Sequence, residues 1–289
     1  MASRAERAMS FGAIAGDYNR LRPPPPDDAV DWLVPPHCQV AVDLAAGTGL
    51  LSRALARRAG QVIAVEPDQR MAAVLRASSP GMQVLDGRGE AIPLPDASAD
   101  GVFISSAWHW MDHELAISDI GRVLRDGGRL GMIWTGRDRQ VDWVAELDSL
   151  RDGGQPRDGG QPGEPRRERD QDGEQRPEGG EQRPEDKARP ERELSRQRAS
   201  GLRREIVLPA ASPFGPAQTA VFAFTRMMLL DDVVSMLGTY SGVITADPAE
   251  RAAGLSRAES ALRERFPGAA EIAVPMVSWC WRASRAARL

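Results

Sequence analysis

Val40-Ala-Val-Asp-Leu-Ala-Ala-Gly-Thr-Gly49 is the stretch of this sequence that decides the fold. A buried strand is predicted over residues 40–44, and a helix is predicted near 50–58, directly after the turn. The glycines at 47 and 49 let the backbone approach a ligand closely. The N-terminus of the following helix directs backbone N–H groups toward the same place. The stretch therefore predicts a strand, turn and helix that bind a small ligand at the turn.

The strand-then-helix pattern continues along the chain. Further strands are predicted over 62–66, 83–86, 101–105 and 130–134, and further helices near 68–77 and 113–124. Arg125-Asp-Gly-Gly128 is predicted as the turn between the last of these helices and the last strand. Apolar runs at 219–225 and 271–281 predict two closing strands, with helices near 229–237 and 248–266. The predicted fold class is α/β, a doubly wound, Rossmann-like, mostly parallel seven-stranded sheet.

One long segment interrupts this pattern. Residues 151–200 combine Gly, Pro and near-equal numbers of acidic and basic side chains, and Asp-Gly-Gly-Gln-Pro occurs at both 152 and 158. With almost no aliphatic residues, the segment cannot bury a core, so we predict a disordered low-complexity insertion. The predicted organisation is an amino-terminal segment at 1–35, an α/β core at 36–150, the insertion at 151–200, and the rest of the same domain at 201–289.

Two acidic residues lie at the ends of predicted strands. Glu66 ends the second strand, where an acid can accept hydrogen bonds from both hydroxyls of a ribose. A dinucleotide fingerprint counted from Gly47 would need Gly or Ala where this chain has Ser52. Asp43 closes the first strand, and the amino-acid half of S-adenosylmethionine has an ammonium group for such an acid to neutralise. S-adenosylmethionine is therefore favoured over a dinucleotide as the ligand.

Five runs of sequence resemble the successive motifs of class I S-adenosylmethionine-dependent methyltransferases. They are Val-Asp-Leu-Ala-Ala-Gly-Thr-Gly at 42–49, Val-Glu-Pro-Asp at 65–68, Gly-Glu-Ala-Ile-Pro-Leu-Pro-Asp at 89–96, Trp-His-Trp at 108–110 and Arg-Val-Leu-Arg-Asp-Gly-Gly at 122–128. The most similar branch is the methyltransferase type 11 group, around trans-aconitate and ubiquinone/menaquinone methyltransferases. Phe-Gly-Ala-Ile-Ala-Gly-Asp-Tyr at 11–18 also resembles the amino-terminal lid helix of that branch.

The resemblance implies a role for each matching residue. Methyl transfer would go to a small-molecule acceptor under a lid formed by the amino terminus and the 214–266 region. The cofactor-binding residues it implies are Asp43, Ala45, Gly47, Gly49, Glu66, Pro67, Gly89, Glu90, Ser105 and Ser106. On the acceptor side it implies Tyr18 and His109, with His109 as a base for an oxygen acceptor. Arg22 would orient a carboxylate acceptor through paired hydrogen bonds.

Three positions depart from the family pattern. Ala45 stands where the first glycine of the motif is usual, Arg88 where many relatives carry an acid for the adenine amine, and Ser106 where glutamine is common. Two other functions stay open at this point. One is an NAD(P)-dependent oxidoreductase, which Ser52 and the absence of a Tyr-x-x-x-Lys pair disfavour, since Lys187 is the only lysine. The other is a methyltransferase-like binding protein without catalysis.

Composition limits the partners. A formal net charge of -4 indicates no overall basic field, so no nucleic-acid partner is expected. Prolines break the one long uncharged stretch, at 206–225, so no membrane span is expected. Two cysteines fit a reducing compartment, and we predict a cytoplasmic protein. His109 and His113 have the spacing of a metal pair but no third ligand near them in sequence, so no metal site is predicted.

Overall fold

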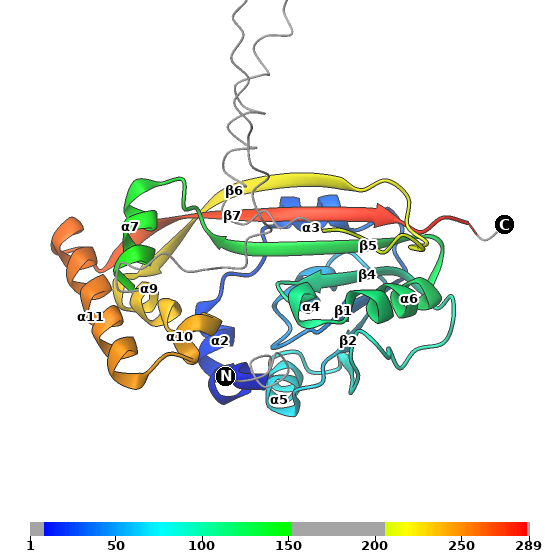
Figure 1. Ribbon diagram of the computed structural model, residues 1–289, viewed down its shortest axis with the longest axis horizontal. Helices are drawn as coiled ribbons and strands as arrows, with labels where there is room; N and C mark the ends of the chain where they lie inside the picture. Colours follow the sequence, from blue (N-terminus) through cyan, green and yellow to red (C-terminus); the bar gives the residue numbers. More distant parts are fainter. Residues whose placement is uncertain (1–8, 152–205, 288–289) are drawn as a thin grey trace, which may run out of the picture.

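The fold is built on one seven-stranded sheet, seen in a computed structural model that describes residues 9–151 and 206–287 (Figure 1). The strand order is β3-β2-β1-β4-β5-β7-β6. Strands β1 to β5 pair in parallel, whereas β7 runs antiparallel to both β5 and β6. The strands are β1 (Val40–Leu44), β2 (Gln61–Val65), β3 (Gln83–Leu85), β4 (Ala99–Ser105), β5 (Leu124–Arg137), β6 (Gln218–Leu229) and β7 (Glu271–Ser284). The predicted doubly wound, seven-stranded fold is confirmed.

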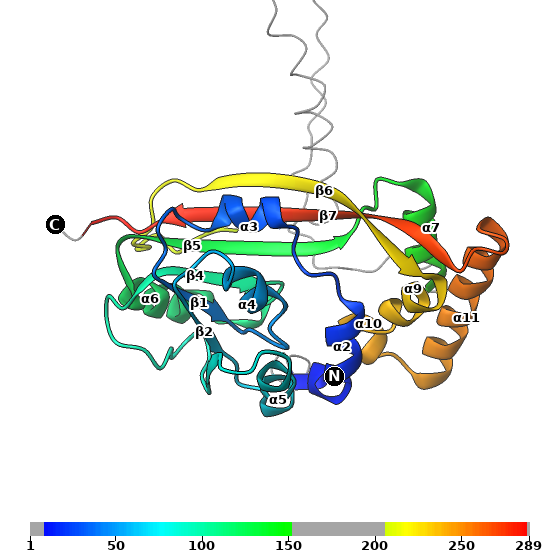
Figure 2. The ribbon, with the colours of Figure 1, turned by 180° about the vertical axis from the view of Figure 1, so that it is seen from behind.

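Helices cover both faces of this sheet. They are α2 (Ala15–Leu21), α3 (Asp27–Leu33), α4 (Leu50–Leu55), α5 (Gln69–Ser78), α6 (His113–Val123), α7 (Asp142–Arg151), α9 (Leu230–Leu237), α10 (Ser241–Ile244) and α11 (Pro248–Arg265), with 3-10 turns η1 (Met9–Ile14) and η2 (Trp108–Trp110). Helix α6 packs on one face through Ile117 and Ile120. Helices α3 and α4 pack on the other through Leu33 and Leu55 (Figure 2). Burial on both faces explains why the parallel strands are nearly continuous apolar runs.

Strand β1 lies where the direction of the strand order reverses. Its neighbours are β2 on one side and β4 on the other, so the chain crosses to opposite faces after β1 and before β4. In open α/β sheets the crevice for a ligand opens outside the carboxyl ends of the strands at this switch point. The turn that begins at Ala45 follows β1 at that edge. The topology therefore puts the glycine-rich turn at the place where a ligand site is expected.

The three longest strands extend beyond the parallel part of the sheet. At one end of β6 and β7 the helices α7, α9, α10 and α11 gather, as Figures 1 and 2 show from opposite sides. These helices share an apolar core with the strand ends, which includes Val233, Leu262 and Met276. Leu21 of α2 is buried in the same core. Helix α2 is thus held on one side by α9 and on the other by α5.

The Arg125-Asp-Gly-Gly128 turn takes a different form from the one predicted. Strand β5 begins at Leu124, directly after α6 ends at Val123. Its pairing with β4 moves from Ala99–Leu124 to Gly101–Arg129, so four residues bulge out of the ladder. Gly127 has φ of 74°, a left-handed conformation that glycine adopts readily. The turn is therefore a bulge inside the strand, and the prediction that the strand starts at 130 was wrong.

The predicted insertion at 151–200 lies outside the described residues, except for Arg151 at the end of α7. On either side of that gap the chain contributes to the same sheet, since β7 pairs with β5 along nine residue pairs. This arrangement supports the proposal that residues 201–289 complete the domain begun at 36–150. Of the predicted amino-terminal segment, η1 and α2 lie near α5, whereas α3 packs on the sheet.

Candidate active site

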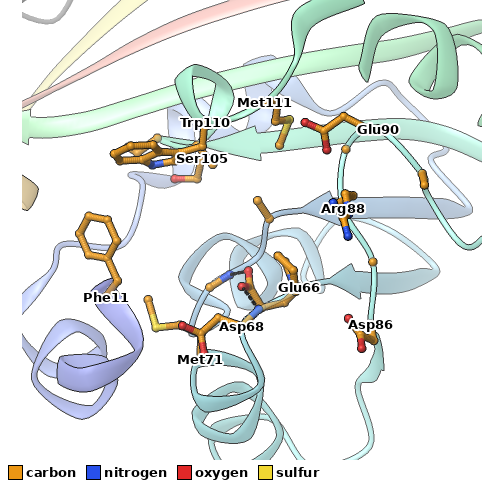
Figure 3. A pocket seen from close by; sticks show the side chains of 18 of the residues that line it. Phe11, Glu66, Asp68, Met71, Asp86, Arg88, Glu90, Ser105, Trp110 and Met111 are labelled. Atoms are coloured by element: carbon orange, nitrogen blue, oxygen red, sulfur yellow. Dashed lines mark hydrogen bonds between the residues drawn. The ribbon is translucent and has the colours of Figure 1, made fainter. Parts of the chain in front are cut away.

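A pocket of about 730 Å³ opens at the carboxyl ends of β1 to β4. Glu66, Asp86 and Ser105 line it at or just after the ends of β2, β3 and β4, as Figure 3 shows. Eight of the predicted cofactor residues line this pocket: Ala45, Gly47, Glu66, Pro67, Gly89, Glu90, Ser105 and Ser106. Asp43 and Gly49, which were predicted with them, are not among the lining residues.

Glu66 ties the second strand to the turn after the first. Its Oε2 accepts a 2.7 Å hydrogen bond from the Gly47 N–H, and its Oε1 accepts one of 2.8 Å from the Asp68 N–H. Burial raises the pKa of this carboxyl group, and the two backbone N–H bonds act in the opposite direction. Each carboxylate oxygen can accept more than one hydrogen bond, so both remain able to accept from a ligand hydroxyl. The acid is therefore held in one orientation at the edge of the pocket.

Asp43 lies behind the same turn and is fully buried. Ser52 donates a 2.5 Å hydrogen bond to its Oδ2. Its Oδ1 is buried and has no hydrogen-bond partner among the described residues. Burial raises the pKa of Asp43 to about 7, and the nearby Glu66 adds to this effect. Ser52, at the third position of a dinucleotide-type glycine motif, thus donates a hydrogen bond to the buried Asp43 carboxylate, which glycine or alanine could not do.

Two of the lining residues have an unusual backbone. Among the described residues four non-glycine residues have positive φ, and two of these, Ala45 and Ser106, line this pocket with φ of 55° each. Ala45 follows β1 and Ser106 follows β4. Left-handed backbone is unfavourable for residues with a Cβ and gathers at functional sites. Each of the two neighbouring strands β1 and β4 is thus followed by a residue with strained, left-handed backbone. These two residues, Ala45 and Ser106, are also two of the three departures from the family pattern.

The segment after β3 forms the wall at one end of the pocket. Asp86, Arg88 and Glu90 all line it, at the end opposite Phe11 (Figure 3). Glu90 Oε1 accepts a 2.8 Å bond from the Asp112 N–H. A Cβ at Gly89 would lie 2.6 Å from the Met111 sulfur, so glycine permits the wall to approach η2. Asp86 was missed from the sequence, although an acid directly after a strand of this sheet would have indicated it.

Aromatic side chains form the other end of the pocket. Phe11 and Tyr18 come from η1 and α2, and Trp110 comes from η2. The Phe11 ring lies 5.8 Å from Tyr18 and 6.3 Å from Trp110, both edge to face. Gly12 lets η1 approach α5, since a Cβ there would lie 2.3 Å from Asp68 Oδ2. Tyr18, predicted from the sequence to lie on the acceptor side, therefore lines the pocket together with Phe11 and Trp110.

The other two residues predicted on the acceptor side lie elsewhere. His109 is in η2, with its ring 4.3 Å from that of Trp110, and is not among the lining residues. Arg22 packs its guanidinium 3.8 Å from the Tyr240 ring centre and donates to the Thr239 carbonyl at 3.1 Å. Its side chain thus joins the lid helix to the α9–α10 connection. In this conformation the structure does not bring either residue into the pocket.

Comparisons with known proteins agree with this geometry. Residues 42–132 match the family described as Methyltransferase domain, of the type 11 group. An uncharacterized methyltransferase of Mycobacterium tuberculosis (strain ATCC 25618 / H37Rv) is 46% identical over 165 residues, covering 56% of this chain and 68% of the relative. The malonyl-[acyl-carrier protein] O-methyltransferase of Methylococcus capsulatus is 35% identical over 134 residues, which cover 42% of this chain and 48% of the relative.

A solved methyltransferase structure from Anaeromyxobacter dehalogenans has the same fold. It superposes with a TM-score of 0.59 at 22% identity, covering 92% of this chain and 99% of that one. Together with the similarity to the mycobacterial relative, these matches favour a methyltransferase over the alternative of an NAD(P)-dependent oxidoreductase. The chain belongs to the type 11 methyltransferase family, on the class I fold of S-adenosylmethionine-dependent enzymes.

Proposed function

We propose that this methyltransferase binds S-adenosylmethionine in the 730 Å³ pocket and transfers its methyl group to a small, uncharged, aromatic or apolar acceptor. The observation that carries the proposal is the division of the pocket. One end presents Asp86, Arg88 and Glu90, whereas the other presents the rings of Phe11 and Trp110, with Asp68 near Phe11 (Figure 3). Tyr18 belongs to the aromatic end, since its ring lies 5.8 Å from that of Phe11. A polar nucleoside and an apolar acceptor would each find a matching surface.

The residues present fit the methyl donor. Glu66 is oriented to accept from ribose hydroxyls, because Gly47 and Asp68 hold its two oxygens. The buried Oδ1 of Asp43 lacks a partner among the described residues, and a buried acceptor without a donor favours the approach of a cation. Gly47 lines the pocket without a side chain, so its backbone is open to a ligand. Many relatives have an acid that binds the adenine amine at the position of Arg88, and we propose that Asp86 binds this amine here.

Alignment is the main contribution that we assign to the protein. When bound, S-adenosylmethionine supplies a methyl group already activated by its positive sulfur. Holding the acceptor in line with that methyl group accounts for most of the rate that a protein can add. Phe11, Tyr18 and Trp110 would hold a flat acceptor between the lid and η2 and exclude water from it. Methylation of a neutral hydroxyl or amine also releases one proton, which we assign to solvent water and not to a side-chain base, so His109 is treated as a residue that supports Trp110.

The character of the acceptor follows from the aromatic end. Arg88, the one arginine among the described residues that line the pocket, lies at the opposite end from Phe11, beside Asp86 and Glu90 (Figure 3). Arg22 is engaged with Thr239 and Tyr240. Among the described residues no cation lines this end of the pocket, although the Arg22 guanidinium lies 5.2 Å from the Tyr18 ring centre, and burying an unpaired carboxylate is costly. This favours an acceptor that is neutral when it binds.

A matched panel of acceptors tests the proposal. Methyl transfer from radiolabelled S-adenosylmethionine should be measured with phenols, hydroquinones and heteroaromatic amines, each beside an analogue that carries a carboxylate on the same ring. The expected result is turnover of neutral aromatic acceptors, with at least about a hundredfold lower kcat/KM for the carboxylates. Preferential turnover of carboxylates would contradict the proposed acceptor class, and the Arg22→Gln variant would then report whether Arg22 moves into the pocket.

A further inference from the structure

A second pocket, of about 610 Å³, lies on the face of the sheet that α3 and α4 cover. The connection from α2 to α3, the α4 helix and the strand β6 form its walls, and Figure 2 shows these elements on the near side. Its charged lining consists of Arg53, Arg57, Arg226 and Asp27. It shares no lining residue with the pocket of the candidate active site. Three cations thus face one carboxylate in a place to which the proposed methyl transfer assigns no role.

Arg226 projects from β6 and is only partly exposed. Its Nη1 is buried and has no hydrogen-bond partner among the described residues. Burial lowers the pKa of Arg226, and the acid that opposes this effect, Asp232, is itself paired with Arg20. Buried donors in folded proteins are nearly always satisfied by protein, water or ligand. The free guanidinium N–H therefore indicates a missing acceptor.

Arg53 is also partly buried, and none of the described residues places a carboxylate at hydrogen-bond distance from it. It donates to two neutral acceptors, the Thr48 carbonyl at 2.9 Å and Asn19 Oδ1 at 2.8 Å. Burial lowers its pKa too, with only longer-range attraction from Asp43 to offset it. A guanidinium has more N–H donors than these two bonds use. Arg53 therefore adds positive charge that the protein itself leaves largely uncompensated.

Asp27 cannot neutralise the pocket. It forms ion pairs with Arg57 at 2.6 Å and with Arg58 at 3.0 Å. Its single negative charge is therefore shared by these two arginines and does not compensate Arg53 or Arg226. These two partners also hold the pKa of Asp27 below its usual value. Counted over the described part of the chain, the charged lining of three arginines and one aspartate has an excess of two positive charges. A phosphate group carries about two negative charges near neutral pH, which matches this excess.

We propose that this pocket binds a ligand through a phosphate group, held by the arginines that line it, Arg226, Arg57 and Arg53. Paired N–H donors of arginine fit the oxygens of phosphate closely. Phe224 and the prolines at 24–26 give the remaining wall an apolar surface for the rest of the ligand. The ligand would contact Arg53, which also donates hydrogen bonds to Thr48 in the glycine-rich turn and to Asn19 on α2.

Inorganic phosphate is the probe that tests the site. The full chain should be titrated by calorimetry with phosphate at fixed ionic strength, with acetate as a carboxylate of lower charge. The variants are Arg226→Gln and Arg57→Gln, and Arg76→Gln on the exposed face of α5 is the control with the same charge change. Saturable phosphate binding is expected, at least about tenfold weaker in the two pocket variants and unchanged in the control.

Thermal unfolding separates loss of the site from loss of the fold. Arg226→Gln removes a buried cation without a direct partner, so without phosphate its melting temperature should equal or exceed that of the wild type. Phosphate should then raise the melting temperature of the wild type and not that of Arg226→Gln. Equal phosphate affinity in Arg226→Gln and wild type would overturn the proposal. Equal affinity for acetate and phosphate would overturn the assignment to a phosphate group.

Discussion

The hydroxyl of Ser52 donates a 2.5 Å hydrogen bond to the carboxylate of Asp43, and both side chains are fully buried beneath the glycine-rich turn. This contact explains why a serine stands where a dinucleotide fingerprint would have glycine or alanine. Asp43 has one oxygen satisfied by Ser52 and a second without a partner among the described residues. The turn is thus built over an acid whose charge the protein only half compensates.

Ser52→Ala should destabilise the fold. Removing the hydroxyl takes the 2.5 Å hydrogen bond from a buried acid, which costs ~1–3 kcal/mol of unfolding free energy. Urea unfolding measured at pH 8 checks this, with Ser149→Ala as the control because its hydroxyl is exposed on α7. The control should change stability by less than ~0.5 kcal/mol. Equal stability of Ser52→Ala and wild type would show that the bond contributes nothing.

The stability of the ligand-free protein should fall as pH rises toward neutrality. Burial raises the pKa of Asp43 to about 7, well above the ordinary value. Between about pH 4 and 7 the folded state therefore binds a proton that the unfolded state has lost, and stability decreases by up to ~1.4 kcal/mol per pH unit. Below about pH 4 Asp43 is protonated in both the folded and the unfolded state, so its destabilising effect is absent there. Urea unfolding across this range should give a shallower slope for Asp43→Asn than for wild type, and parallel slopes would contradict the assignment.

Ala45→Gly should stabilise the protein. Ala45 has φ of 55°, a conformation that costs a residue with a Cβ roughly 1–2 kcal/mol. Glycine removes this strain but loses about 0.5–1 kcal/mol through its greater freedom when unfolded, so a net gain of up to ~1 kcal/mol is expected. Ala46→Gly is the matched control, since Ala46 is not among the residues with positive φ and should only lose stability. Denaturant midpoints of both variants decide the matter, and a loss in Ala45→Gly would contradict the account.

His109→Asn should retain most of the activity. The imidazole lies against Trp110 outside the lining of the pocket, and we assign the proton that a neutral acceptor loses on methylation to solvent water and not to His109. General base catalysis is worth about 10²–10⁴-fold, so a reduction in kcat of less than tenfold is expected. Steady-state methyl transfer with an acceptor from the panel gives this value. A loss of about a hundredfold or more, with a pH profile that changes shape, would instead establish His109 as the base.

Much of the fold follows from local sequence. The apolar runs that became β1, β2 and β4 are buried on both faces, so they carry a strong signal even without alternation. Glu66 and Gly47 were predicted to belong to one site because the ends of adjacent parallel strands must lie side by side. The bulge at 125–128 was not predictable, since Arg125 contacts Asp100 on the neighbouring strand and only the pairing reveals it.

The acceptor side of the site was harder to predict. Trp108, His109 and Trp110 are consecutive, and their η2 turn sends Trp108 into the core while Trp110 lines the pocket. No periodicity distinguishes these directions in so short a turn. The position of Arg22 depends on Tyr240, more than two hundred residues later in the chain. Contacts of this kind depend on the packing of the α9–α11 helices, which the sequence near Arg22 does not encode.

The most direct test of the central claim is calorimetric titration with S-adenosylmethionine and S-adenosylhomocysteine, with NADH in parallel. Wild type should be compared with Glu66→Ala and with Glu264→Ala, an exposed acid on α11, and thermal melts should verify that each variant is folded. We expect micromolar binding of both adenosyl ligands, weakened about tenfold or more in Glu66→Ala and unchanged in Glu264→Ala. Equal affinity in wild type and a folded Glu66→Ala, or binding of NADH alone, would contradict the proposed cofactor site.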